Sequence, residues 1–165
     1  MVSFHSHSGI YTLETDQLLP ISGEEAWAFF SAPENLAAIT PPYMGFKITS
    51  NRTGQMYAGQ IITYTIGLLP GIRSAWVTEI THVQEGRFFV DEQRFGPYAF
   101  WHHQHWFEPR DAGTYILDRV SYKLPFGYAG RLAHPFIRRQ LTKIFTYRHH
   151  ALAERFPASE TQRVE

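Results

Sequence analysis

The stretch that decides the fold is residues 11–42, YTLETDQLLPISGEEAWAFFSAPENLAAITPP. Its first part, residues 11–19, predicts a strand. Ser22 and Glu25 then form a capping box, in which the serine hydroxyl accepts a hydrogen bond from the amide three residues on. This signal predicts a helix over residues 22–30.

A second short helical segment is expected immediately afterwards, over residues 33–39. Pro33 stands near its start, where a missing N–H group is tolerated best. Pro41 and Pro42 end the segment, because the residue before a proline is driven out of helical geometry. A strand followed directly by a helical pair is therefore the expected opening of the fold.

From residue 45 onwards the sequence takes on the pattern of strands. Stretches rich in Ile, Val, Thr, Tyr, Phe and Trp are separated by turn-like segments. These turns are too short for parallel crossovers, so an antiparallel sheet is expected. The predicted strands are residues 45–50, 60–66, 74–83, 87–93, 99–108 and 113–124.

The last segment, residues 131–156, has a helical period and predicts one long helix with a kink at Pro135. Arg148 interrupts its apolar stripe, which we expect to cover the concave face of the sheet. The predicted class is α+β, with a curved antiparallel sheet of about seven strands wrapped round the C-terminal helix. A closed, lipocalin-like sheet is the alternative, which the early helical pair disfavours. The stripe consists of Leu132, Phe136, Ile137, Leu141, Ile144, Phe145 and Leu152.

Length and composition indicate one domain. A length of 165 residues is typical of one domain, which we expect over residues 10–156. Residues 1–9 are expected to form a flexible leader and residues 157–165 a flexible tail. Lys+Arg 15 balances Asp+Glu 15, so nucleic acid is not expected as a partner. The absence of cysteine excludes disulfides and thiol catalysis. Neither a signal peptide nor a membrane-spanning stretch is visible, which favours a cytoplasmic location.

Strand alternation places several polar side chains among inward-facing aromatic ones. Burying a polar group without a partner costs a few kcal/mol, so a group of them on an apolar face indicates a site. We expect the aromatic side chains to contact an apolar ligand and the polar ones to orient its polar end. The expected ligand-binding residues are Trp76, Phe89, Asp91, Gln93, Trp101, His103, His105, Phe107, Asp118 and Tyr122.

The chain resembles the START/Bet v 1-like, or SRPBCC, superfamily, and in particular its polyketide cyclase/dehydrase-like ligand-binding proteins. The resemblance covers roughly residues 10–156 and implies the helix-grip fold, with a hydrophobic ligand cavity between sheet and C-terminal helix. It implies no particular reaction. The matching segments are PISGEEAWAFF (20–30), PENL (33–36), FVDEQ (89–93), GPY (96–98), WHHQH (101–105) and YKLPFG (122–127), together with Pro41, Pro42, Thr114 and Asp118.

The function expected from these observations is noncatalytic binding of a small hydrophobic or amphipathic molecule, such as a lipid, with no cofactor. The alternative is a cofactor-independent cyclase, dehydratase or hydrolase, in which His103 or His105 acts as the base and Asp118 orients it. A metal site formed by the two histidines and Asp91 or Asp118 is less favoured, because two ligands on one strand are a weak signal. A cavity filled by the protein's own side chains is a further alternative.

Two surface features have open interpretations. The apolar loop over residues 67–73 either gates the cavity or packs against the terminal helix. The basic residues of that helix indicate either an anionic partner or an ordinary solvated face. Membrane contact needs a free apolar face, and the apolar stripe is expected to be used by the sheet, so membrane contact is disfavoured. The oligomeric state is left open.

Overall fold

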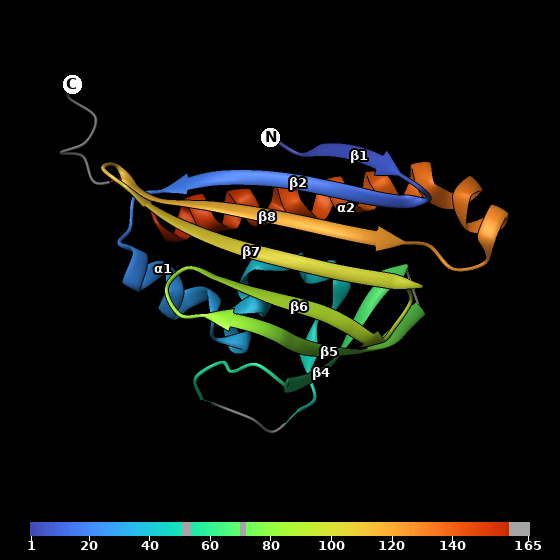
Figure 1. Ribbon diagram of the computed structural model, residues 1–165, viewed down its shortest axis with the longest axis horizontal. Coiled ribbons are helices and arrows are strands. Elements are labelled where there is room, and N and C mark those ends of the chain that lie inside the picture. The colour runs from blue at the N-terminus through green and yellow to red at the C-terminus, as the bar shows by residue number, and fades with distance from the viewer. Residues whose placement is uncertain (51–53, 70–71, 159–165) are drawn as a thin grey trace.

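The computed structural model describes residues 1–50, 54–69 and 72–158. It shows a curved sheet with a long helix lying across its concave face (Figure 1). The expected tail over residues 157–165 lies mostly outside the described residues. In the described part of the chain, no helix is both long and apolar enough to cross a membrane.

The sheet is antiparallel throughout, with the strand order β1-β2-β8-β7-β6-β5-β4-β3. In the described ranges β1 and β3 lie at its two edges, so the sheet is open and the lipocalin-like alternative is wrong. The described sheet has eight strands, where about seven were expected. The additional strand is β1, which lies within residues 1–9, where we expected a flexible leader. The strands are β1 Ser3–His7, β2 Ile10–Leu19, β3 Lys47–Ile48, β4 Gln60–Leu69, β5 Ile72–Gln84, β6 Phe88–Phe95, β7 Phe100–Arg110 and β8 Gly113–Lys123.

The helical pair after β2 is confirmed. Ser22 caps the first helix, and its Oγ accepts a hydrogen bond from the Glu25 amide at 3.1 Å. The second segment is a 3-10 helix and begins at Pro33. A further short turn of 3-10 helix follows before β3. The helices are α1 Gly23–Phe30, η1 Pro33–Ile39, η2 Pro42–Met44 and α2 Gly127–Arg155.

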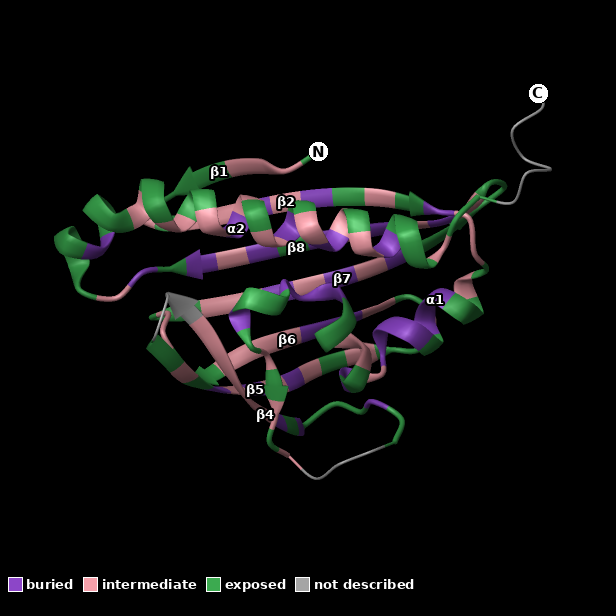
Figure 2. Cartoon of the chain, turned by 180° about the vertical axis from the view of Figure 1, so that it is seen from behind, coloured by how far each residue is buried: buried purple, intermediate pink, exposed green. Residues whose placement is uncertain are grey.

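Helix α2 covers the sheet with only part of its apolar stripe. Leu141, Phe145 and Leu152 are buried against the strands, and buried residues recur along α2 and β8 (Figure 2). Leu132 is 85% exposed and Phe136 is 48% exposed. The first turns of α2 extend past the ends of β2 and β8 (Figure 1), so the expectation that the whole stripe packs on the sheet is wrong.

Two apolar clusters form the core, one at each end of the concave face. The first surrounds Trp27 and Phe107, and the second surrounds Val120 and Phe145. Along β8 the polar residue Asp118 separates Ile116 of the first cluster from Val120 of the second. The inward polar residues therefore lie in a seam between two apolar clusters.

The described residues of the apolar segment 67–73 belong to the paired ends of β4 and β5. Gly67 belongs to the last part of β4, and Ile72 begins β5 with an exposed side chain. Residues 70 and 71 lie outside the described residues, so the proposed gate stays a hypothesis.

Candidate functional site

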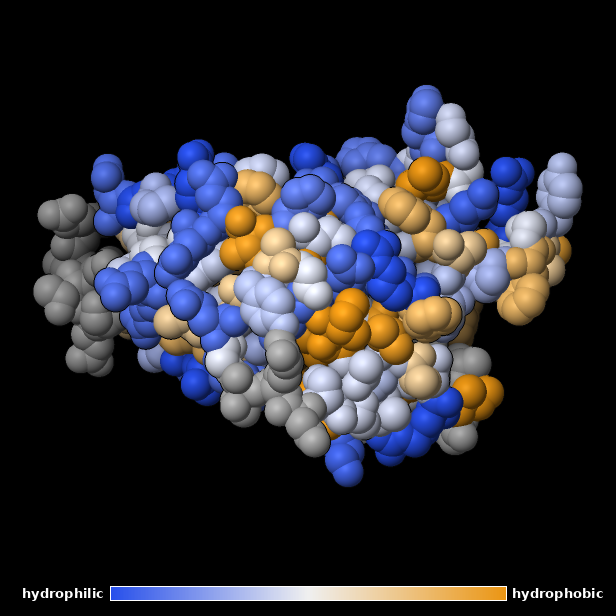
Figure 3. All heavy atoms as spheres, turned by 60° about the horizontal axis from the view of Figure 1, so that its bottom comes forward, coloured by the Kyte–Doolittle hydropathy of each residue, from blue (hydrophilic) through white to orange (hydrophobic). Residues whose placement is uncertain are grey.

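A cavity of about 160 Å³ lies between the concave face of the sheet, η1 and α2. Its wall is mostly apolar, and Ile62, Ile80 and Phe89 from three neighbouring strands contribute to it. On one face of the molecule, hydrophobic side chains gather among hydrophilic ones (Figure 3). The polar part of the wall includes Tyr64, Thr78, Asp91, His103, His105 and Arg148.

Alternation predicted correctly which strand residues face inward, but not which of them reach the cavity. Among the described residues, the cavity wall excludes Gln93, Phe107, Asp118 and Tyr122. The predicted residues that line it are Trp76, Phe89, Asp91, Trp101, His103 and His105.

Three of the excluded residues have structural partners. Gln93 holds the β6–β7 turn, since its Nε2 donates to the Tyr98 carbonyl at 2.7 Å and its Oε1 accepts from the Tyr98 amide. Phe107 packs edge-on against Trp27 in the first cluster. Tyr122 is fully buried in the second cluster. These three residues therefore stabilise the structure around the cavity and do not form part of the cavity wall.

The polar cluster is assembled by strand register. Asp91 on β6 is the cross-strand neighbour of His103 on β7, and His105 on β7 is the neighbour of Asp118 on β8. Residues two apart on one strand face the same side, so all four side chains point to the concave face. Three adjacent strands thus bring two imidazoles between two carboxylates.

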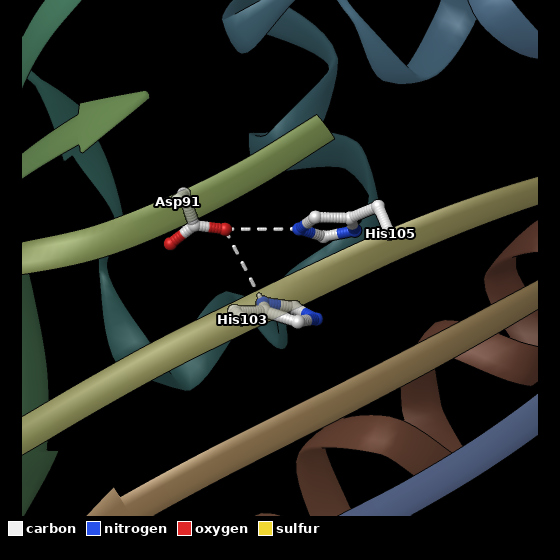
Figure 4. Close-up of side chains that lie close together, drawn as sticks. All are labelled: Asp91, His103 and His105. Carbon is white, nitrogen blue, oxygen red and sulfur yellow. Dashed lines mark hydrogen bonds and ion pairs between the residues drawn. The ribbon is translucent and has the colours of Figure 1, made fainter. Parts of the chain in front are cut away.

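Close contacts link the four side chains. His103 Nε2 lies 2.9 Å from Asp118 Oδ1. His105 Nε2 lies 2.9 Å from Asp91 Oδ2, a contact drawn in Figure 4. His103 Nδ1 is 3.4 Å from the same Asp91 oxygen. His105 Nδ1 is 2.8 Å from Asp118 Oδ1, but the direction does not suit a hydrogen bond, and this nitrogen has no hydrogen-bond partner among the described residues.

Arg148 of α2 is a member of the cluster that the sequence did not identify. Its Nη1 lies 3.4 and 3.5 Å from the two carboxylate oxygens of Asp118, and its guanidinium stacks over the Phe145 ring at 5.0 Å. The side chain is 7% exposed, and its Nε is without a hydrogen-bond partner in the described part of the chain. The sequence did contain a signal for this role, because Arg148 is a basic residue within an apolar helical stripe that was expected to face two inward-pointing aspartates.

Electrostatics assign charges to the cluster. Burial opposes ionisation of Asp118, but the Arg148 charge, the hydrogen bond with His103 and the close approach of His105 hold its pKa well below the ordinary value. The pKa of Asp91 is also lowered, because the histidines outweigh its burial. Burial lowers the pKa of His103, whereas for His105 the two carboxylates outweigh burial and raise it. Two carboxylates are thus balanced by one guanidinium and one imidazolium.

Tyrosines add neutral hydrogen-bonding groups to the wall. The Tyr64 hydroxyl lies 3.3 Å from Thr78 Oγ1, which also accepts a hydrogen bond from Trp76 Nε1 at 3.1 Å. Burial raises the pKa of Tyr64, and burial likewise raises that of Tyr98, so both hydroxyls keep their protons. Beside the charged seam, the cavity therefore presents uncharged polar groups.

An open antiparallel sheet that grips a long C-terminal helix over an internal cavity defines the chain as an α+β protein with a helix-grip fold. The chain belongs to a family of domains of unknown function, DUF8410, whose model matches residues 20–156. No protein with a curated function matches the sequence.

Solved structures with the same fold come from several bacteria. A protein from Chromobacterium violaceum has a TM-score of 0.67 at 14% identity, over 90% of this chain and 99% of the other. A protein from Arthrobacter aurescens has a TM-score of 0.66 at 12% identity, over 99% and 98%. A nucleoside-diphosphate sugar epimerase from Corynebacterium glutamicum has a TM-score of 0.61 at 24% identity, over 86% of this chain but only 28% of the epimerase. At these identities the likeness shows the fold alone.

Removing Arg148 should destabilise the protein more than removing any exposed arginine of α2. In Arg148→Met the Asp118 carboxylate stays buried without its cation, which typically costs about 3–5 kcal/mol. Urea denaturation would measure the free energy of unfolding. Arg139→Met, on an exposed part of the same helix, serves as the control and should change it by about 0.5 kcal/mol or less.

A second variant separates charge from packing. Asp118→Asn combined with Arg148→Met removes both charges, so it should recover part of the lost stability. If Arg148→Met has the same free energy of unfolding as the parent protein, the ion pair between Arg148 and Asp118 does not contribute to stability.

Proposed function

We propose that the protein binds a small hydrophobic or amphipathic molecule in the cavity between the sheet and α2. The observation that carries this proposal is a cavity whose wall is mostly apolar and includes one compact charged cluster. Sites for small molecules typically combine an apolar lining with a few convergent polar groups. Apolar contacts supply affinity in such a site, and the polar groups determine orientation.

We further infer that the chain is a member of the START/Bet v 1-like superfamily, close to its polyketide cyclase-like ligand-binding proteins. The supporting observations are the helix-grip architecture and the segments 20–30, 89–93 and 101–105. The resemblance covers nearly the same residues as the DUF8410 match.

Charge balance favours an uncharged polar group on the ligand. Asp91 and Asp118 are balanced by Arg148 and a protonated His105. An ionised ligand head would add a buried charge that nothing compensates. A hydroxyl or carbonyl group could instead exchange hydrogen bonds with Tyr64, His103 or the free Nε of Arg148, all of which belong to cavity-lining residues.

Filling the cavity should reduce binding of an apolar probe. Ala32 lines the cavity at the start of η1, whereas Ala38 in the same helix is exposed and does not belong to the described wall. Ala32→Trp should weaken the affinity for the uncharged dye N-phenyl-1-naphthylamine by about tenfold or more, which corresponds to about 1.4 kcal/mol. Fluorescence titration measures the dissociation constant.

Ala38→Trp is the matched control and should bind the dye as the parent protein does. Equal affinities in the parent and Ala32→Trp proteins, both folded by circular dichroism, would exclude the cavity as the binding site. Native mass spectrometry of the purified parent protein would show whether a cellular molecule is retained.

A second candidate is a cofactor-independent cyclase, dehydratase or hydrolase that uses His103 as a base. Burial lowers the pKa of His103 at the cavity wall, which favours its neutral form, and its Nε2 lies 2.9 Å from Asp118 Oδ1. A histidine oriented by a carboxylate is a common arrangement for proton transfer.

The simplest test of the hydrolase form of this candidate uses p-nitrophenyl esters of increasing chain length. Turnover should fall by about 100-fold or more in His103→Gln, since general acid–base catalysis contributes about 10²–10⁴-fold. Release of p-nitrophenol at the same rate by both proteins would reject His103 as the base.

A further inference from the structure

The two cavity-facing histidines and Asp91 have a geometry that suits a metal ion. Each offers one ligand atom, and these atoms all lie within 4.8 Å of one another. Asp91 Oδ2 is shared, at 2.9 Å from His105 Nε2 and 3.4 Å from His103 Nδ1, and the three side chains point toward one another in Figure 4. We propose that Asp91, His103 and His105 bind one divalent transition-metal ion at the cavity wall.

Two of the three separations between the ligand atoms fit this proposal. Zinc binds imidazole nitrogen and carboxylate oxygen at about 2.0–2.2 Å, which places the ligand atoms around one ion about 3.0–3.4 Å apart. The two separations measured from Asp91 Oδ2 are close to this range. An ion could therefore enter between the three side chains with small movements of their rings.

The surroundings of the histidines also match a metal site. Imidazoles that bind a metal almost always direct their other ring nitrogen at a carboxylate, a carbonyl or water. His103 Nε2 lies within hydrogen-bond distance of Asp118 Oδ1, at 2.9 Å, whereas His105 Nδ1 lies 2.8 Å from the same oxygen in a direction that does not suit a hydrogen bond. Asp118 is in turn held by Arg148. This outer carboxylate would thus orient the His103 ring.

The arrangement leaves coordination positions open toward the cavity. Asp91, His103 and His105 all line the cavity, whereas Asp118 lies behind them and outside the described wall. Two histidines and one carboxylate on one side of an ion leave its opposite side for solvent or substrate. Two nitrogen ligands and one oxygen ligand favour ions such as Fe²⁺, Co²⁺ or Zn²⁺ over Mg²⁺ or Ca²⁺.

Charge complementarity supports a cation. A metal-bound imidazole carries no extra proton, so an entering ion would displace the proton of His105. The two aspartates then exceed the single guanidinium of Arg148 by one negative charge in a buried seam, which attracts a cation. The proposal goes beyond ligand binding by the cavity and does not depend on it.

The test is isothermal titration calorimetry of chelator-treated protein with ZnCl₂ and with CoCl₂. One ion per chain should bind with micromolar or tighter affinity, and His103→Gln and His105→Gln should each lose at least 100-fold. Asp118→Asn should lose 10- to 100-fold, because it removes only the outer carboxylate. His102→Gln is the control, since its imidazole pairs with Glu92 away from the cavity wall, and it should bind as the parent does.

A second readout protects the test against variants that fold poorly. Co²⁺ bound to the parent protein should show visible absorption bands of nitrogen and oxygen coordination. The proposal is overturned if the parent protein binds neither ion, or if only His102→Gln abolishes binding. Binding of N-phenyl-1-naphthylamine by the chelator-treated protein tests the cavity separately, so failure of one proposal is distinguishable from failure of the other.

A separate observation concerns the end of α2 that extends past the sheet. Phe126, Tyr128 and Leu132 are almost fully exposed, and Phe136 is half exposed. Tyr128, Leu132 and Phe136 recur every four residues, so they lie along one side of the helix. An apolar face is therefore free at this end, although the sequence had predicted that the sheet would cover it.

The charge around this face has one sign. No Asp or Glu occurs between Asp118 and Glu154, whereas Arg131, Arg138 and Arg139 lie on the same part of the helix. The Arg131 guanidinium lies 5.4 Å from the centre of the Tyr128 ring. Aromatic and aliphatic side chains beside cations are typical of helices that lie on anionic membrane surfaces. We propose that this end of α2 docks on an anionic lipid surface.

Cosedimentation with lipid vesicles tests this docking. The protein should sediment with vesicles of equal parts phosphatidylglycerol and phosphatidylcholine at low salt, and remain in solution with phosphatidylcholine alone. Phe126→Ser combined with Leu132→Ser should weaken the binding at least tenfold. Tyr43→Ser, which changes an exposed aromatic residue on η2, is the control and should leave it unchanged.

The docking proposal is overturned if the parent protein does not sediment with anionic vesicles. It is also overturned if the parent and the double variant sediment with these vesicles to the same extent. A third contrary result is a concentration-dependent dimer of the parent, seen by light scattering and lost in the double variant, which would assign the face to a second copy of the chain.

Discussion

The buried contact between Arg148 on α2 and Asp118 on β8 is the constraint on which the site depends. A carboxylate at this depth needs a cation. Among the described residues of the sheet, Asp118 contacts the imidazoles of His103 and His105, and the permanent charge comes from Arg148. Arg148 therefore has to come from the helix, which places α2 at one position along the concave face. With Asp118 ionised and held, His103 has a hydrogen-bond partner behind it, and both histidines present a nitrogen toward Asp91. The charged part of the cavity wall thus depends on this ion pair as well as on strand register.

The same contact explains why the core is divided. Two apolar clusters alone would pack α2 over the sheet, but apolar contacts are nondirectional and leave its position along the sheet loosely determined. A charged seam between them restricts the helix to the position at which Arg148 reaches Asp118. Replacing such a pair by apolar residues often does not reduce stability, so the pair fits a positional or functional role better than a purely stabilising one.

The candidate site could be predicted in part. Alternation along the strands identified His103, His105, Asp91 and Asp118 as inward-facing, because successive side chains of a strand point to opposite faces. It could not separate residues on the cavity wall from residues below it, such as Asp118 and Phe107. Depth depends on the curvature of the sheet and on where the helices lie. Tyr64 and Arg148 were missed for the same reason, since each belongs to the site only through a distant segment.

Local chemistry in the sequence determined the elements. The Ser22 cap, the prolines around residues 33–42 and the strand periods depend on interactions within a few residues, and they gave the helical pair, the antiparallel sheet and the long final helix. Tertiary structure alone decided which side chains meet. The register of β6, β7 and β8 sets the distances in the polar cluster, and the length of the sheet decides how much of α2 it covers. These distances join residues far apart in the chain, so no local pattern encodes them.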